Sequence, residues 1–155
     1  MSPDRLLALW GRLGGSAVGR WLFSQAVRLA VPYTGALGAR VLSLAPGRAV
    51  VTLRDRRGVR NHLGSVHAIA LANLAEMASG LAMVSALPPG VRSIVTRIEI
   101  DYQKKARGTL TATGSAAPPT VTEPVTSLAR AEIRDAAGGV VAAAQVTWQL
   151  APRTP

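Results

Sequence analysis

One segment of the chain, residues 66–84 (VHAIALANLAEMASGLAMV), limits the possible folds more than any other. Alanine, leucine and methionine dominate it, and these residues are strong helix formers. Its apolar side chains would point in nearly all directions around a helix, and a soluble helix of that kind is buried. At 1.5 Å per residue the helix would be roughly 28 Å long, about the width of a small domain. The sequence therefore predicts a long central helix, ended by Pro88-Pro89-Gly90.

After this segment the hydrophobic pattern changes to a period of two, which is typical of half-buried strands. The pattern predicts four strands, at residues 94–103, 109–115, 125–134 and 140–150. Another strand is expected before the helix, at residues 48–54 (RAVVTLR). The strands after the helix are joined by short loops, which favour antiparallel pairing. The fold class is therefore α+β, with a sheet of about five strands that must curve around the helix to bury most of its surface.

The first of the four strands has a clear division into two faces. Ile94, Ile98, Ile100 and Tyr102 are expected on one face, and charged or amide side chains alternate with them. This alternation predicts a half-buried strand.

The first part of the chain, residues 1–45, is expected to be a basic helical segment that packs on the core. Residues 19–30 (GRWLFSQAVRLA) have a mixed amphipathic pattern that ends at Pro32. A second helical segment is expected over residues 35–44, before a turn at Pro46-Gly47. The core domain is then 46–150, and residues 151–155 are a loose tail. Two interpretations of the basic helices stay open: they pad the core or a subunit interface, or they lie on a membrane surface.

Composition excludes several kinds of site. The chain of 155 residues fits one domain. Without cysteine it has no disulfides, thiolate metal sites or cysteine nucleophiles. The two histidines, His62 and His67, are five positions apart, which misses the spacing of a helical zinc pair, so no metal site is expected.

The formal net charge of +10 favours polyanionic partners, which include nucleic acid, anionic lipid and phosphate-bearing cofactors. Aromatic residues make up only 4% of the chain, which disfavours nucleic-acid binding by base stacking. No secretory signal and no membrane-spanning segment are expected. The sequence thus predicts a cytoplasmic protein, and it allows peripheral membrane contact.

Glu76 is the only charged residue between Arg60 and Arg92. An unpaired carboxylate buried within an apolar helix is costly, so Glu76 must have a partner or face a cavity or an interface. Residues three and four apart form a stripe with it on the helix: Ile69, Asn73, Gly80 and Met83. Gly80 leaves space beside the carboxylate. Two interpretations stay open, a pocket in which Asn73 and Gly80 contact a substrate, and a structural glutamate that hydrogen-bonds a neighbouring loop.

The residues that lead into the helix, 61–68 (NHLGSVHA), form the second candidate feature. Ser65 is a plausible N-cap. The free backbone N–H groups of the first turn suit an anion or a developing oxyanion. Asn61 could orient a carbonyl or a water. The alternative is an ordinary capped helix start with Asn61 in a turn.

The spacing Asn61-x-x-Gly64-x-x-His67, followed by the acid Glu76, resembles the hotdog thioesterases of the phenylacetate-degradation type. Two later segments are also similar to that family, at 102–108 (YQKKARG) and 138–142 (GGVVA). The similarity covers about residues 48–150. It implies a hotdog fold, a long central helix wrapped by a curved antiparallel sheet, with the N-terminal helices as an addition. It also implies acyl-CoA hydrolysis and a homodimer or tetramer.

The resemblance further implies roles for individual residues. Asn61 would position the thioester carbonyl or the attacking water, with Gly64 and His67 beside it. The backbone N–H of Ala68 would stabilise the oxyanion. Glu76 would be the general base, or a nucleophile that forms an anhydride. Coenzyme A would be part of the substrate, and no other cofactor is expected.

The sequence also departs from the family pattern. Ala68-Ile69 replaces the usual Gly-Gly, Glu76 replaces the commoner aspartate, and Lys105 stands at a usual proline. These departures leave an alternative function open, that of a non-catalytic protein that binds acyl-CoA or lipid.

Basic residues in the second half of the chain gather at Lys104, Lys105 and Arg107. They are expected to bind the phosphates of coenzyme A, or else they form a solvated strand end. A second cluster could bind phosphates equally well: Arg54, Arg56, Arg57 and Arg60.

Overall fold

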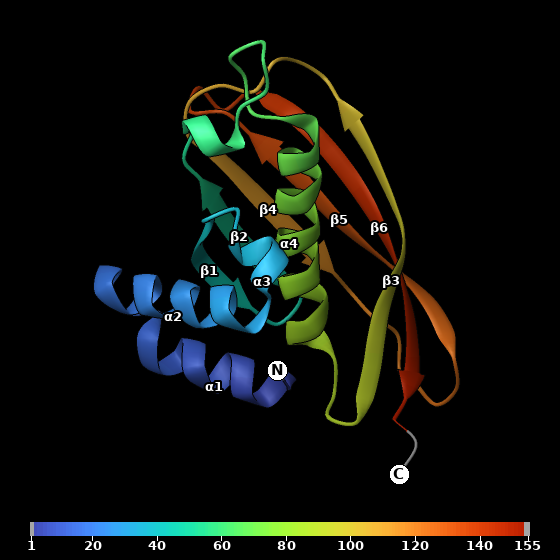
Figure 1. The fold of residues 1–155 in the computed structure, drawn as a ribbon. Coiled ribbons are helices and arrows are strands. Elements are labelled where there is room, and N and C mark those ends of the chain that lie inside the picture. The colour runs from blue at the N-terminus through green and yellow to red at the C-terminus, as the bar shows by residue number, and fades with distance from the viewer. Residues whose placement is uncertain (1, 154–155) are drawn as a thin grey trace.

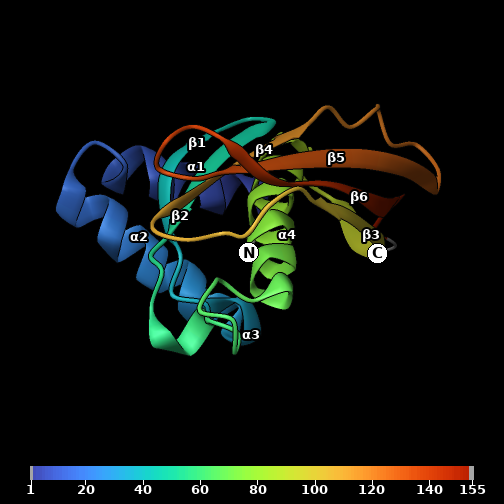
Figure 2. The same cartoon turned by 90° about the horizontal axis from the view of Figure 1, so that it is seen from above.

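A 19-residue helix, α4 (Ala68–Ala86), lies in the curve of a six-stranded antiparallel sheet in the computed structural model, which describes residues 2–153 (Figure 1). Figure 2, seen from above, shows the sheet bending over this helix. This is the α+β hotdog arrangement that the resemblance implied. The strands, in their order across the sheet, are β1 (Arg40–Ala45), β2 (Arg48–Leu53), β4 (Leu110–Ala116), β5 (Val125–Arg134), β6 (Val140–Pro152) and β3 (Val91–Tyr102).

The central helix begins and ends two residues later than predicted. Val66 is not part of the helix, because it forms an isolated antiparallel bridge with Arg60. Its N–H donates to the carbonyl of Ala106. His67 has extended backbone angles, and helical geometry starts at Ala68. Of the part of the chain that is described, α4 alone is long and apolar enough to cross a bilayer, and 56% of its most apolar 18-residue stretch is buried inside the fold.

Small residues on α4 allow the sheet to approach closely. Leu74, Ala75 and Ala78 are fully buried against the strands. In β4, Gly114 lies directly on the helix backbone, and a β-carbon there would collide with the carbonyl group of Ala78. The core therefore forms by close contact between the small side chains of the helix and a strand that has a glycine at the crossing point.

The sheet has six strands rather than about five, because residues 40–45 form β1 instead of the expected helix. Gly38 has a positive φ of 69°, which ends the helical backbone before the strand. The strand then pairs with β2 through a hairpin at the predicted Pro46-Gly47 turn. Val41 and Leu44 of β1 are buried in the core.

The predicted division of β3 into two faces is wrong at Ile94. A bulge lies between Val95 and Arg97 and shifts the register with β6. Beyond it, Ile98 pairs with the buried Val146, although Ile98 itself is 41% exposed at the edge of the sheet, whereas Ile94 pairs with Gln149 and is 65% exposed. The extra residue of a bulge reverses the alternation, so Ile94 falls on the opposite face from Ile98.

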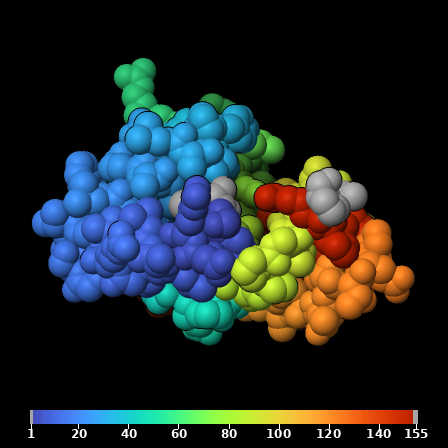
Figure 3. Space-filling model, turned by 90° about the horizontal axis from the view of Figure 1, so that it is seen from below, coloured from blue at the N-terminus to red at the C-terminus, as the bar shows by residue number. Residues whose placement is uncertain are grey.

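The predicted N-terminal helices are present as α1 (Pro3–Leu13), α2 (Ala17–Ala30) and the short α3 (Pro32–Gly35). Figure 3, seen from below, shows the first two as a continuous block on one side of the molecule. Trp10 and Phe23 join them through an edge-to-face contact, with ring centroids 4.9 Å apart.

Ser24 connects the helical block to the sheet, because its Oγ accepts a hydrogen bond of 3.0 Å from the N–H of Val41 in β1. The outer side of α2 is unusually apolar for a surface, with Val18, Trp21, Leu22 and Leu29 exposed.

At the other end of the chain, β6 continues to Pro152. Residues 151–152 therefore belong to the sheet, where a loose tail was expected. Residues 154–155 lie outside the described residues.

Candidate functional site

Glu76 lies in the middle of α4, and its half-buried side chain faces a pocket of about 230 Å³. The inner wall comes from α4 and β6: Met77, Gly80, Leu81, Val84 and Trp148. The outer wall comes from the N-terminal helices: Leu6, Val27, Ala30, Val31 and Thr34. Glu76 is the only charged residue among the described residues of this lining, so the pocket suits an apolar group that carries its reactive centre beside a carboxylate.

Burial raises the pKa of the Glu76 carboxyl above its ordinary value, because the charged form loses contact with water. Among residues 2–153, no ion pair or hydrogen bond holds this carboxylate. A carboxylate in such a position is a better base than one in water, and its oxygens are free to accept a proton.

Gly80 separates the carboxylate from the indole ring of Trp148. A β-carbon at Gly80 would lie 3.4 Å from Cζ2 of Trp148 and 3.7 Å from Oε1 of Glu76. The missing side chain therefore leaves open the space between the two groups. The Nε1 of Trp148 is buried and has no hydrogen-bond partner within the described structure.

The cap of α4 is His67, and the prediction of Ser65 as N-cap is wrong. The Nδ1 of His67 accepts a hydrogen bond of 3.1 Å from the N–H of Ile69. Ser65 lies two residues before the cap, where its hydroxyl donates to Oδ1 of Asn61 at 3.2 Å.

The side-chain oxygen of Asn61 organises its own loop. Besides the Ser65 hydroxyl, Oδ1 accepts the backbone N–H groups of Leu63 (3.0 Å) and Ser65 (3.2 Å). Gly64 completes this turn with a positive φ of 69°. The carbonyl oxygen of the Asn61 side chain is thus engaged, and the NH₂ of the amide is the part that could reach a ligand.

The first residue of α4, Ala68, is exposed, and its N–H donates no hydrogen bond to any described residue. Its carbonyl accepts a hydrogen bond of 3.0 Å from the hydroxyl of Tyr102, at the end of β3. This contact places the start of α4 beside the edge strand of the sheet. An unpaired amide at a helix start suits an anion or an oxyanion.

In a single chain the two candidate features do not meet. His67 and Asn73 line a separate hollow of about 310 Å³, which also includes Tyr33 and Ile69. This hollow shares no lining residue with the Glu76 pocket. Within one chain the structure therefore brings Glu76 together with Gly80, and it does not bring either of them to Asn61, Gly64, His67 or Ala68.

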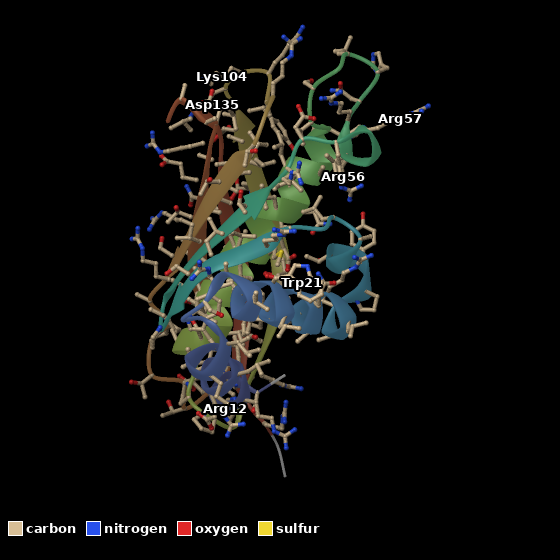
Figure 4. All side chains as sticks on the ribbon, turned by 90° about the vertical axis from the view of Figure 1, so that its left-hand side faces the viewer. Arg12, Trp21, Arg56, Arg57, Lys104 and Asp135 are labelled. Carbon is tan, nitrogen blue, oxygen red and sulfur yellow. The ribbon has the colours of Figure 1, made fainter. Side chains whose placement is uncertain are left out.

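The predicted basic cluster is only partly free. Lys104 forms an ion pair of 2.6 Å with Asp135 in the β5–β6 hairpin, and the two lie together at one end of the sheet (Figure 4). Lys105 and Arg107 are exposed.

In the second cluster, Arg56 donates to the carbonyls of Ala36 and Leu37, each at 3.1 Å. Arg60 pairs with Asp55 at 2.6 Å, and this bond is the main reason that the pKa of Asp55 is lowered. Arg57 begins the 3₁₀ turn Arg57–Val59 near Arg56 (Figure 4). Two of the four arginines therefore tie loops together.

The outer wall of the pocket was not predicted from the sequence. Part of its signal was present, because Val27 and Ala30 are three positions apart on one face of α2, whereas Val31 and Thr34 follow the end of that helix. That spacing predicts a buried face, but it does not reveal that the face stops short of Glu76 and leaves a cavity.

Solved structures share this fold. A structural-genomics protein, APC5556, aligns with a TM-score of 0.80 and 26% identity over 95% of this chain and 97% of its own. A Pseudomonas aeruginosa protein, PA5026, described as a probable thioesterase, aligns with a TM-score of 0.73 and 20% identity over 81% of this chain and 91% of its own. A mutant of PaaI, a phenylacetic acid degradation protein from Thermus thermophilus, aligns with a TM-score of 0.66 and 27% identity over 79% of this chain and 99% of its own.

No curated protein matches the sequence significantly. A family model described as a domain of unknown function, DUF4442, matches residues 19–150, which include α4, strands β1 to β5 and β6 up to Leu150. The chain therefore belongs to the DUF4442 family, a branch of the hotdog fold.

Proposed function

We propose that the protein hydrolyses acyl-thioesters, with acyl-CoA as the substrate class and Glu76 as the base that activates water. The observation that carries this proposal is a carboxylate that has no bonding partner among residues 2–153 and lies in an apolar pocket, where burial raises its pKa. The fold is shared with proteins described as thioesterases, which supports the same reaction class.

The reaction follows from this placement. A water molecule beside Glu76 attacks the thioester carbonyl while a carboxylate oxygen takes its proton. The tetrahedral intermediate then collapses, the carbon–sulfur bond breaks, and the protonated Glu76 returns the proton to the departing thiolate. The products are a carboxylic acid and a free thiol, and no electrons are exchanged with any other group. The apolar lining holds the acyl part and excludes bulk water.

Stabilisation of the oxyanion needs a donor that one chain does not bring to Glu76. We assign this role to the N–H of Ala68 and the NH₂ of Asn61 from a second copy of the chain, with Gly64 and His67 shaping that loop. The strand β3 supports such a dimer, because it lies at the end of the strand order and its 12 residues pair on one side only. Ile98 in β3 and Ile69 in α4 are exposed near that edge.

The alternative function is the binding of acyl-CoA without hydrolysis. It is favoured by Ala68 and Ile69 at the helix start, because side chains there crowd the approach of a thioester to the free amide. Under this alternative the pocket would hold an acyl group, but Glu76 would never transfer a proton.

An assay of thiol release from a panel of acyl-CoA substrates distinguishes the two functions. The wild-type protein should release thiol, and Glu76→Gln should reduce kcat by about 100-fold or more, as loss of a general base does. Glu132→Gln is the matched control, since Glu132 pairs with Arg134 away from the pocket. A folded Glu76→Gln protein with unchanged kcat would contradict the proposal, whereas acyl-CoA binding without any thiol release would establish the alternative.

A further inference from the structure

A basic cleft lies at the end of the molecule where α1 begins, β3 starts and β6 ends. Its volume is about 640 Å³, and the residues that line it include Arg5, Arg92 and Arg153. Figure 3 shows the start of α1, the turn before β3 and the end of β6 meeting on this face. The backbone N–H of Arg153 donates to the carbonyl of Gly90 at 2.6 Å, which fixes the end of β6 beside that turn.

Within residues 2–153, the positive charge of this cleft is not balanced by an acidic residue in its lining. None of the ion pairs formed within residues 2–153 uses Arg5, Arg92 or Arg153. Three arginines that converge from separate parts of the chain repel one another, and an anion with several oxygens relieves that repulsion. Guanidinium groups bind phosphate through paired hydrogen bonds.

The cleft adjoins the pocket of the proposed reaction. Val84 lines both, so the two hollows meet at one side chain. Val84 follows Glu76 by eight positions on the same helix, and Leu87, which also lines the cleft, follows it by eleven. At 1.5 Å per residue these offsets correspond to about 12 and 17 Å along the helix axis. That span is comparable to the extended pantetheine arm, which separates the thioester of an acyl-CoA from its phosphates.

We propose that Arg5, Arg92 and Arg153 bind the phosphate groups of coenzyme A while the thioester lies beside Glu76. This inference rests on the proposed function and names the part of the protein that recognises the carrier. The cleft lies near the end of α4, whereas Lys105 and Arg107 lie near its start, beyond the contact between Tyr102 and Ala68. The two groups of basic residues are therefore alternatives for the same phosphates.

Steady-state kinetics on two substrates tests the assignment. One is an acyl-CoA, and the other is the N-acetylcysteamine thioester of the same acid, which lacks the phosphates. In the triple variant Arg5→Ser, Arg92→Ser and Arg153→Ser, KM for acyl-CoA should rise by at least about tenfold, as expected for loss of charged hydrogen bonds. Its kcat, and its KM for the truncated thioester, should stay within about twofold of wild type, a change of less than half a kcal/mol.

Two further variants complete the comparison. The matched control removes three exposed arginines of β1, β2 and β5 that form no ion pair within the described residues, Arg40→Ser, Arg48→Ser and Arg130→Ser, and should keep the wild-type KM for both substrates. The rival variant is Lys105→Ser with Arg107→Ser. If this pair raises KM for acyl-CoA and the cleft variant does not, the inference is overturned.

Calorimetry with free coenzyme A and with inorganic pyrophosphate tests the cleft without any turnover. The wild-type protein should bind both, more weakly as salt is raised, and the cleft variant should lose this binding. Binding that depends on the three arginines, in a protein that never releases thiol, would refute the proposed hydrolysis and leave the phosphate site standing. Hydrolysis with an unchanged KM in the cleft variant, or no binding of coenzyme A by the wild type, would refute the phosphate site.

Discussion

Glu76 and Trp148 lie on either side of Gly80, so that a carboxylate from the helix and an indole ring from the sheet border one space. The carboxylate has a raised pKa and the indole Nε1 is buried without a partner among the described residues. The polar groups of an otherwise apolar pocket thus lie at a single position. Substitutions of different size at Gly80 can therefore test pocket size and helix stability separately.

A methyl group at Gly80 should stabilise the protein. The β-carbon would lie at ordinary contact distance from its neighbours, the nearest of which is Cζ2 of Trp148 at 3.4 Å. Alanine is favoured over glycine within a helix by about 1 kcal/mol. Urea unfolding of Gly80→Ala should therefore give a free energy of unfolding higher by about 0.5–1 kcal/mol.

Gly80→Leu should instead fill the pocket and raise KM for acyl substrates. A Gly80→Leu protein with wild-type KM would exclude this pocket as the acyl site.

The activity of the protein should rise with pH and level off above the raised pKa of Glu76, because only the carboxylate form accepts a proton. The same shift has a consequence for stability. Burial favours the protonated form, so the native state binds this proton more tightly than the unfolded chain does. The wild type should thus become less stable relative to Glu76→Gln as pH rises through the folded-state pKa, and the two should unfold alike below the unfolded-state pKa. Denaturant midpoints at several pH values measure this, and a constant difference would contradict it.

Replacement of the cap residue should weaken the start of α4. In His67→Ala the N–H of Ile69 loses its acceptor, and loss of an N-cap side chain costs about 1 kcal/mol. His67→Asn supplies another acceptor and should retain most of the stability. Ser65→Ala removes the hydroxyl from the residue that the sequence suggested as the cap, and it serves as the comparison. Equal stabilities for His67→Ala and His67→Asn in urea would show that the cap bond contributes nothing.

The contact between Gly114 and Ala78 predicts a severe substitution. Because a β-carbon at Gly114 would collide with a backbone carbonyl, neither partner can move without displacing a helix or a strand. Gly114→Ala should lower the free energy of unfolding by about 3 kcal/mol, the upper range for overpacking. Gly11→Ala in α1 is the control, since nothing lies within 4 Å of its added β-carbon. Thermal unfolding of both variants tests the difference, and similar melting temperatures would contradict the contact.

The central helix and the strands that follow it could be predicted from the sequence, because their hydrophobic periods are long and regular. The strand β1 could not. Of its six residues only Val41 and Leu44 are buried, and a spacing of three is typical of a helix rather than of a strand. The bulge in β3 has no local signal either, so simple alternation places Ile94 with Ile98.

The candidate site divides in a similar way. Glu76 stands out in the sequence as a charge within an apolar helix, and its place beside Gly80 follows from helical spacing. The N-cap, however, depends on the extended backbone angles of His67. The bridge between Val66 and Arg60, just before His67, holds the backbone in that conformation. The wall formed by Leu6 and Val27 depends on tertiary packing between distant segments.

The pocket has walls of two different origins, and this has a consequence for how the protein can change. Glu76 belongs to α4, the helix that the sheet must enclose. The residues that surround Glu76 on this wall are therefore constrained by the requirements of folding. The opposite wall belongs to helices that precede the sheet and leave its hydrogen-bonded ladders untouched. Substitutions within the first 34 residues can therefore change which ligands fit the cavity. They would leave α4, which carries Glu76, and the sheet around it unchanged.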